Sequence, residues 1–264
     1  MNPTLLAILA ICAYLASAVL IFRPLAKDGS KRAALLCAWA AIALHSFYTA
    51  LVIQQNGGFN FSFFSTASLI SMIVALLLLL AAFGKPVVSL GMFLFPVAAL
   101  MLGLDLIFPE KQHPLNTHSW EMNTHILSSI IAFSLLNIAA LQAILLAIQN
   151  QQLKSHPPKR YIQSMPPLQT MEALLFQMIG AGLLFLSISL LSGFFFLEDI
   201  FAQHLAHKTI LSMAAWLIFS GLLLGRWRYG WRGRTAIKWT LFGFLFLLLA
   251  YFGSKLVLEL ILKR

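Results

Sequence analysis

The sequence predicts an all-α fold: a polytopic integral membrane helical bundle of about eight transmembrane helices, with both termini outside. Hydrophobic residues make up 60% of the chain and charged residues 10%, whereas soluble domains hold about 45–50% apolar and about 25% charged residues. The apolar residues form continuous runs of about twenty, the length that crosses a hydrocarbon core. Because these runs do not alternate with polar residues, an outer-membrane barrel is excluded.

Eight runs have the length of a transmembrane helix. Their predicted bounds are 4–22, 33–54, 64–83, 86–108, 123–148, 171–196, 209–225 and 239–261. The first run contains Ala16-Ser17-Ala18, which resembles a signal-peptidase site. No positive charge precedes it and the apolar run continues to Phe22, so we expect a retained anchor. With no long soluble segment, we predict a single membrane domain over residues 1–264.

Lysine and arginine set the predicted orientation. Of the 18 basic residues, 13 fall in four alternate loops, 23–32, 84–86, 150–168 and 226–238. Cytoplasmic loops carry an excess of such residues, so these loops are predicted inside and both termini outside. The net charge of +10 therefore indicates how the chain is oriented in the lipid bilayer. With no basic soluble domain, we expect no nucleic-acid partner.

The histidines gather toward the predicted outer face. Five of the seven lie on or near it, namely His113, His118, His125, His204 and His207. His125 opens the predicted span 123–148 and follows Trp120, which is expected at the membrane surface, by five residues. A histidine in that place can be a metal ligand, a proton carrier or a capped helix-end residue.

His45 lies inside the second predicted span, about 18 Å from its cytoplasmic start. A histidine at that depth is a functional-site candidate. The other reading is a neutral imidazole bonded to a neighbouring carbonyl or hydroxyl, such as that of Ser46 or Tyr48. His45 and His125 differ in predicted depth by roughly 13 Å, whereas two imidazoles on one iron need nitrogens about 4 Å apart. Each histidine would therefore need its own partner.

Candidate partners differ for the two histidines. For His125 they are His118, His204 and His207. For His45 they are Met72, Met178 and Met213, because methionine can share haem iron with histidine. A zinc site on His204 and His207, completed by Glu198 and Asp199, is the other metal option.

A basic, aromatic segment runs from Arg226 to Arg234 and contains Trp227, Tyr229 and Trp231. Arginines and interfacial tryptophans at a cytoplasmic turn are typical of membrane anchoring. The alternative is that the arginines grip an anionic group, a lipid headgroup or a haem propionate.

Three stretches together resemble one family. They are Ala43-Leu44-His45 with Gly57-Gly58 and Ser65 to Leu69; Trp120 to His125 with the helix after it; and Lys208 to Trp216 with Gly230 to Ala236 and Tyr251 to Gly253. In order and spacing they resemble the integral-membrane cytochrome c assembly family, in particular its HemX/YpjD-type branch. The resemblance implies a haem-handling protein of the bacterial inner (plasma) membrane, with His45 and His125 as haem-related histidines.

Several residues of that family's sequence pattern are missing from this chain. Its tryptophan-rich W-G-x-x-W-x-W-D segment should precede Lys208, where this sequence has no tryptophan. The partner histidines of the family's two pairs should fall at Leu224 and near Ile261. One histidine of each pair is thus present.

Three functions follow as hypotheses. The first is a haem-binding protein of haem handling or cytochrome c biogenesis, with His125, His45, Trp120, His207 and His204 as cofactor-binding candidates. The second is a non-enzymatic regulator or scaffold of haem biosynthesis that has lost the haem site; its partner would be a haem-biosynthesis or cytochrome c maturation protein. The third is a small-solute permease. With no nucleophile and base pair, phosphate loop or carboxylate dyad in the sequence, we expect no enzyme.

Overall fold

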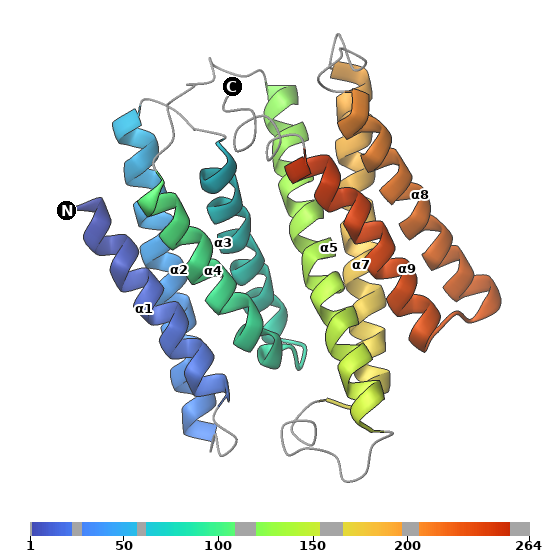
Figure 1. The fold of residues 1–264 in the computed structure, drawn as a ribbon, viewed down its shortest axis with the longest axis horizontal. Helices are drawn as coiled ribbons and strands as arrows, with labels where there is room; N and C mark the ends of the chain where they lie inside the picture. The colour runs from blue at the N-terminus through green and yellow to red at the C-terminus, as the bar shows by residue number, and fades with distance from the viewer. Residues whose placement is uncertain are drawn as a thin grey trace. The chain divides into compact units, whose positions relative to one another are not determined.

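A computed structural model of the chain describes residues 2–22, 28–56, 62–108, 120–153, 166–196 and 206–253. Within these ranges every regular element is helical, with no strand (Figure 1). Eight helices there are long and apolar enough to cross a membrane. The predicted all-α membrane bundle is confirmed, while the orientation of its termini stays a prediction.

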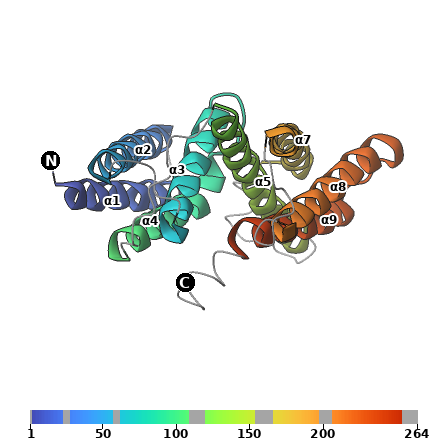
Figure 2. The ribbon, with the colours of Figure 1, turned by 90° about the horizontal axis from the view of Figure 1, so that it is seen from above.

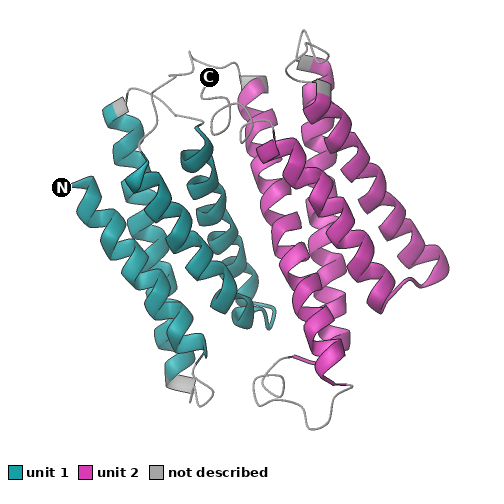
Figure 3. Ribbon diagram, in the orientation of Figure 1, with its two compact units in different colours: residues 1–117 teal, residues 118–264 magenta. Residues whose placement is uncertain are grey.

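The chain divides into two compact units, residues 1–117 and residues 118–264 (Figure 3). Unit 1 holds α1 (Pro3–Phe22), α2 (Asp28–Asn56), α3 (Phe63–Ala82), the 3-10 turn η1 (Val88–Leu90) and α4 (Gly91–Ile107). Unit 2 holds α5 (Trp120–Gln152), α7 (Leu168–Phe196), α8 (Ala206–Tyr229), α9 (Gly233–Leu248) and the π-helical turn η2 (Leu249–Gly253). The single membrane domain over residues 1–264 stays a prediction.

The basic segment between the last two spans is more helical than expected. The span predicted at 209–225 continues to Tyr229, and the helix predicted from residue 239 begins at Gly233. Arginine and lysine are good helix formers, so an apolar count underestimates helix length at a charged end. The chain reverses where Gly230 and Gly233 adopt φ values of 66° and 52°, a conformation that glycine takes without steric cost.

In unit 1, α1 packs against both α2 and α4 (Figure 2). Both α1 and α2 carry fully buried small residues; they are Ala7 and Ala10 of α1 and Ala34, Ala38 and Ala41 of α2. Small side chains let two membrane helices approach closely. The Ser17 hydroxyl adds a bond across the contact, donating to the backbone carbonyl of Ala34 at 2.8 Å.

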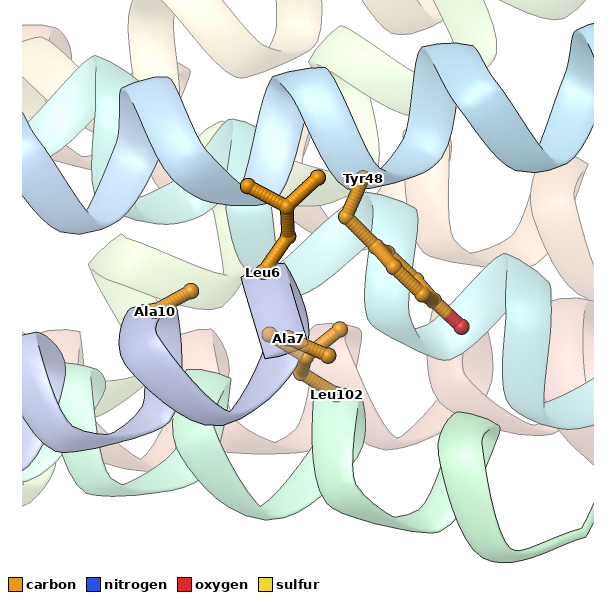
Figure 4. Close-up of a cluster of buried hydrophobic side chains, with 5 residues drawn as sticks. All are labelled: Leu6, Ala7, Ala10, Tyr48 and Leu102. Carbon is orange, nitrogen blue, oxygen red and sulfur yellow. The ribbon is translucent and has the colours of Figure 1, made fainter. Parts of the chain in front are cut away.

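A buried apolar cluster lies where three helices of unit 1 meet, formed by Leu6, Ala7 and Ala10 of α1, Leu102 of α4 and Tyr48 of α2 (Figure 4). The Tyr48 hydroxyl donates to Oδ2 of Asp105 at 3.2 Å, and the Ser65 hydroxyl of α3 donates to Oδ1 at 2.6 Å. The Asp105 carboxylate, on α4, therefore ties α2 and α3 to α4.

In unit 2, α5 packs against α7 and α9, and α8 packs against α9 and α7. The close approach of α5 and α7 occurs at Gly182. A Cβ atom added there would lie 2.7 Å from Cγ of Leu136, a fully buried side chain of α5. Glycine is required at this position because the facing leucine occupies the space.

We expect Asp105→Leu to destabilise unit 1, because the hydroxyls of Tyr48 and Ser65 lose their acceptor. A buried polar group without its partner costs about 1–3 kcal/mol. Asp105→Asn keeps one acceptor oxygen and should cost less. Thermal unfolding of the detergent-purified variants, followed by loss of the monodisperse chromatographic peak, measures both. An Asp105→Leu variant as stable as the parent protein would contradict the role of the carboxylate.

We expect Gly182→Ala to lower the stability of unit 2 by about 1–3 kcal/mol, the usual cost of overpacking a core. The matched control is Gly180→Ala, two residues away on α7, where an added Cβ meets nothing within 4 Å. That control should be neutral, or stabilising by up to about 1 kcal/mol, because alanine is the better helix former. Equal melting temperatures for the two variants would argue against a close approach at Gly182.

Candidate functional site

His45 lies in the middle of α2, and its side chain is completely buried. Its Nε2 is 3.0 Å from Oγ of Ser68 on α3, and its Nδ1 is 3.4 Å from Oη of Tyr14 on α1. The Tyr14 ring also meets the imidazole edge-on, with ring centroids 6.0 Å apart. A hydroxyl can donate or accept, so either neutral tautomer of His45 is satisfied.

The hydroxyl partners of His45 are not the ones expected from the sequence. Ser46 is exposed on α2 and donates to the sulfur of Met72 at 3.4 Å, while Tyr48 donates to Asp105. Consecutive side chains of a helix do not face one another, which directs Ser46 away from His45. The expectation of Ser46 or Tyr48 as partner is therefore wrong, because the actual partners come from α1 and α3.

Both nitrogens of His45 have hydrogen-bond partners in this structure, and whether His45 binds haem stays a prediction. Binding iron requires an imidazole nitrogen with a free lone pair, yet both nitrogens have hydroxyl partners and no part of the side chain is exposed. Among the proposed methionine partners, Met72 accepts a hydrogen bond from Ser46, while the pairing of His45 with Met178 or Met213 stays a prediction. The geometry makes His45 a polar contact between α1, α2 and α3.

His125 lies at least five residues inside α5 and is partly buried. Its Nδ1 is 2.9 Å from the backbone carbonyl of Ser189 on α7 and 3.3 Å from Oγ of Ser192. The Ser192 hydroxyl donates its own proton to the same carbonyl at 2.9 Å. Both neighbours of Nδ1 are thus acceptors, so Nδ1 carries a proton, and in the neutral imidazole Nε2 keeps the lone pair.

This arrangement removes one of the three interpretations of His125. The first four N–H groups of a helix are the ones that need a cap, and His125 lies beyond them in α5, so it is not a capped helix-end residue. A ring nitrogen that donates to a backbone carbonyl is typical of metal-bound histidines, because the bond orients the other nitrogen toward the metal. Nε2 of His125 has no partner among the described residues, so His125 fits a ligand or a proton carrier.

A cluster of buried serines surrounds the contact of His125 with α7. Its members are Ser128 and Ser129 of α5 and Ser189 and Ser192 of α7. The hydroxyls of Ser129 and Ser189 lie 2.5 Å apart and join the two helices directly. Sequence reasoning did not identify this cluster. Its signal is a pair of serine-bearing stretches in two otherwise apolar spans, a composition common at membrane helix interfaces.

The other predicted site residues are not brought to His125 within the described structure. Trp120 begins α5, but its side chain lies outside the described residues, as do His118, His204, Glu198 and Asp199. His207 is the second residue of α8 and is exposed. Among the described residues, no three side chains of His, Cys, Asp or Glu gather as a metal site. Whether His204 or His207 binds a cofactor stays a prediction.

Arg226, the first residue of the basic segment, is paired with an acidic residue of another helix. Nη1 of Arg226 lies 2.8 Å from Oε1 of Glu172 on α7, and the guanidinium carbon lies 4.6 Å from the ring centroid of Phe176. Arg226 also donates to the backbone carbonyl of Trp231 at 3.3 Å. Its charge is therefore neutralised within the protein, and Arg226 fixes the end of α8 to α7.

Comparison with known proteins finds a matching family and similar proteins. Residues 29–262 match the cytochrome C assembly protein family. The chain is 31% identical over 259 residues to the inner membrane protein YpjD of Escherichia coli (strain K12), covering 97% of this chain and 98% of YpjD. It is 29% identical over 148 residues to the cytochrome c biogenesis protein CcsA of Chlamydomonas reinhardtii, covering 55% of this chain and 40% of CcsA. No solved structure matches the chain.

The family match covers most of the chain, and YpjD aligns with it over nearly its full length. Together with eight membrane-spanning helices, these matches identify a multi-pass protein of the bacterial inner membrane. The chain belongs to the cytochrome c assembly protein family.

Proposed function

We propose that this chain is a non-enzymatic, haem-binding protein of haem handling or cytochrome c biogenesis, and that His125 holds the iron. The observation that carries the proposal is the imidazole of His125. Its Nδ1 donates to the Ser189 carbonyl, and its Nε2 has no partner among the described residues. The name of the relative CcsA, a cytochrome c biogenesis protein, supports the same process.

The protein's own residues would prepare the imidazole for this role. The carbonyl of Ser189 and the hydroxyl of Ser192 hold the ring in one orientation and one tautomer. The contact between Ser129 and Ser189 keeps α5 and α7 in register around it. When bound, haem supplies an iron centre that accepts the lone pair of an imidazole nitrogen.

A second imidazole is missing from the place where the family resemblance expects one. For His125, the outer histidine of the resemblance, that place is near Ile261, outside the described residues. The partner of His45 should fall at Leu224 on α8, whose side chain is 61% exposed. Haem would then be held by one described histidine, His125, with His207 and His204 as candidates for further contacts.

The second candidate function is a membrane scaffold or regulator of haem biosynthesis that has lost the haem site. Its support is His45, the other histidine of the family resemblance, whose two nitrogens are both engaged by hydroxyls. In this reading the fold is kept for a protein partner, a haem-biosynthesis or cytochrome c maturation protein. The described residues add nothing in favour of the third hypothesis, a small-solute permease.

We expect the detergent-purified protein to take up added haem and to show a Soret band shifted from that of free haem. His125→Gly should weaken haem binding by more than about tenfold, since loss of a supporting hydrogen bond alone costs a metal site 10–100-fold. Added imidazole should restore the spectrum of this variant by supplying the missing nitrogen. Absorption titrations measure each quantity.

Two matched variants make the haem test specific. His45→Gln keeps polar contacts to Tyr14 and Ser68 and should load haem like the parent protein. His207→Ala removes an exposed histidine of unit 2 and reports its contribution. Haem loading that is unchanged by His125→Gly would refute the ligand role of His125, and a parent protein that takes up no haem would favour the scaffold.

A further inference from the structure

A pocket of about 370 Å³ opens in unit 2 between the C-terminal end of α5 and the first turns of α9. Its lining residues are Ala147, Asn150 and Gln151 of α5 and Arg234, Ile237 and Lys238 of α9. Haem binding at His125 does not use these residues.

The lining combines two cations with two amides over an apolar base. Arg234 and Lys238 are four residues apart, so they lie on the same face of α9. Asn150 and Gln151 add amide groups from α5, and amides can donate hydrogen bonds. Arg234 also lies in the first turn of α9, where the helix dipole favours a negative charge. The polar residues of the lining therefore offer hydrogen-bond donors to an anion.

The protein supplies no described counter-ion for these two cations. Glu172 is the one acidic residue of unit 2 whose side chain the structure describes, and it is paired with Arg226 at 2.8 Å. No ion pair to Arg234 or Lys238 is found among the described residues. Basic residues that only set the orientation of a membrane helix need to lie on the cytoplasmic side, but they do not need to share a cavity with amides of another helix. Membrane topology alone therefore does not explain the place of Arg234 and Lys238 in the pocket.

Aromatic side chains indicate the depth of the pocket in the membrane. Trp239, next to Lys238, is 37% exposed and packs on Trp231 with ring centroids 5.5 Å apart. Trp231 in turn stacks on Tyr229, which is 75% exposed. Tryptophan and tyrosine gather at the level of lipid headgroups. Lys238 adjoins Trp239 in the sequence, so we expect this cation of the pocket at the same level.

We propose that this pocket binds a phosphate-bearing anionic group, and that its source is the headgroup of an anionic phospholipid. Arginine and lysine bind the phosphate by charge-assisted hydrogen bonds, and the amides of Asn150 and Gln151 donate to its remaining oxygens. Ile237 and Ala147 contact the apolar part of the lipid next to the headgroup. The site needs no haem and is independent of the function proposed above.

The test uses the full-length protein in detergent, with phosphatidylglycerol, phosphatidylcholine or inorganic phosphate added separately. Native mass spectrometry counts bound lipid, and the melting temperature reports stabilisation. We expect phosphatidylglycerol to bind and to raise the melting temperature more than either other probe. The double variant Arg234→Gln/Lys238→Gln should weaken its binding by roughly tenfold or more, because it removes the charge-assisted hydrogen bonds that the two residues make to the phosphate.

The matched control is Arg228→Gln/Arg232→Gln, which removes two charges from the same segment outside the pocket, at positions that are exposed like Arg234 and Lys238. It should bind phosphatidylglycerol like the parent protein. If the first double variant does not fold, Asn150→Asp/Gln151→Glu on α5 places repelling charges in the pocket and should abolish binding. An equal loss of phosphatidylglycerol binding in Arg234→Gln/Lys238→Gln and in Arg228→Gln/Arg232→Gln would overturn the proposal. Equal stabilisation by inorganic phosphate would overturn the lipid source.

Discussion

The interior of a bilayer offers no water to polar side chains, so each polar group within a span must find its partner in the protein. Unit 1 meets this constraint across helices. The Asp105 carboxylate accepts from Tyr48 and Ser65, and His45 lies between Tyr14 and Ser68. Since these contacts join α1, α2, α3 and α4, the need to satisfy polar groups also determines how the helices pack.

The two histidines that resemble haem ligands differ because their neighbours differ. Hydroxyls occupy both nitrogens of His45, which is fully buried, and this makes it part of the packing of unit 1. A backbone carbonyl and a serine oxygen, both acceptors, face Nδ1 of His125 and leave Nε2 with its lone pair. The same side chain thus serves structure in one unit and offers a ligand atom in the other.

The basic segment shows a similar division. Arg226 is neutralised by Glu172 and covered by Phe176, so it stabilises the contact of α8 with α7. Arg234 and Lys238 face a pocket that α5 completes, with no described carboxylate beside them. Equal charges in one short stretch of sequence therefore have different roles, decided by whether an acidic residue of another helix reaches them.

The sequence by itself determined the fold class, the eight spans and the family, because apolar run length, charge and motif order can be read along the chain. It also identified His125 as the histidine to examine. Only the tertiary structure decided the hydrogen-bond partners of His45, the tautomer of His125 and the pairing of Arg226. These depend on residues 23 to 67 positions away, such as Ser68, Glu172 and Ser192, and no local pattern encodes which helices meet.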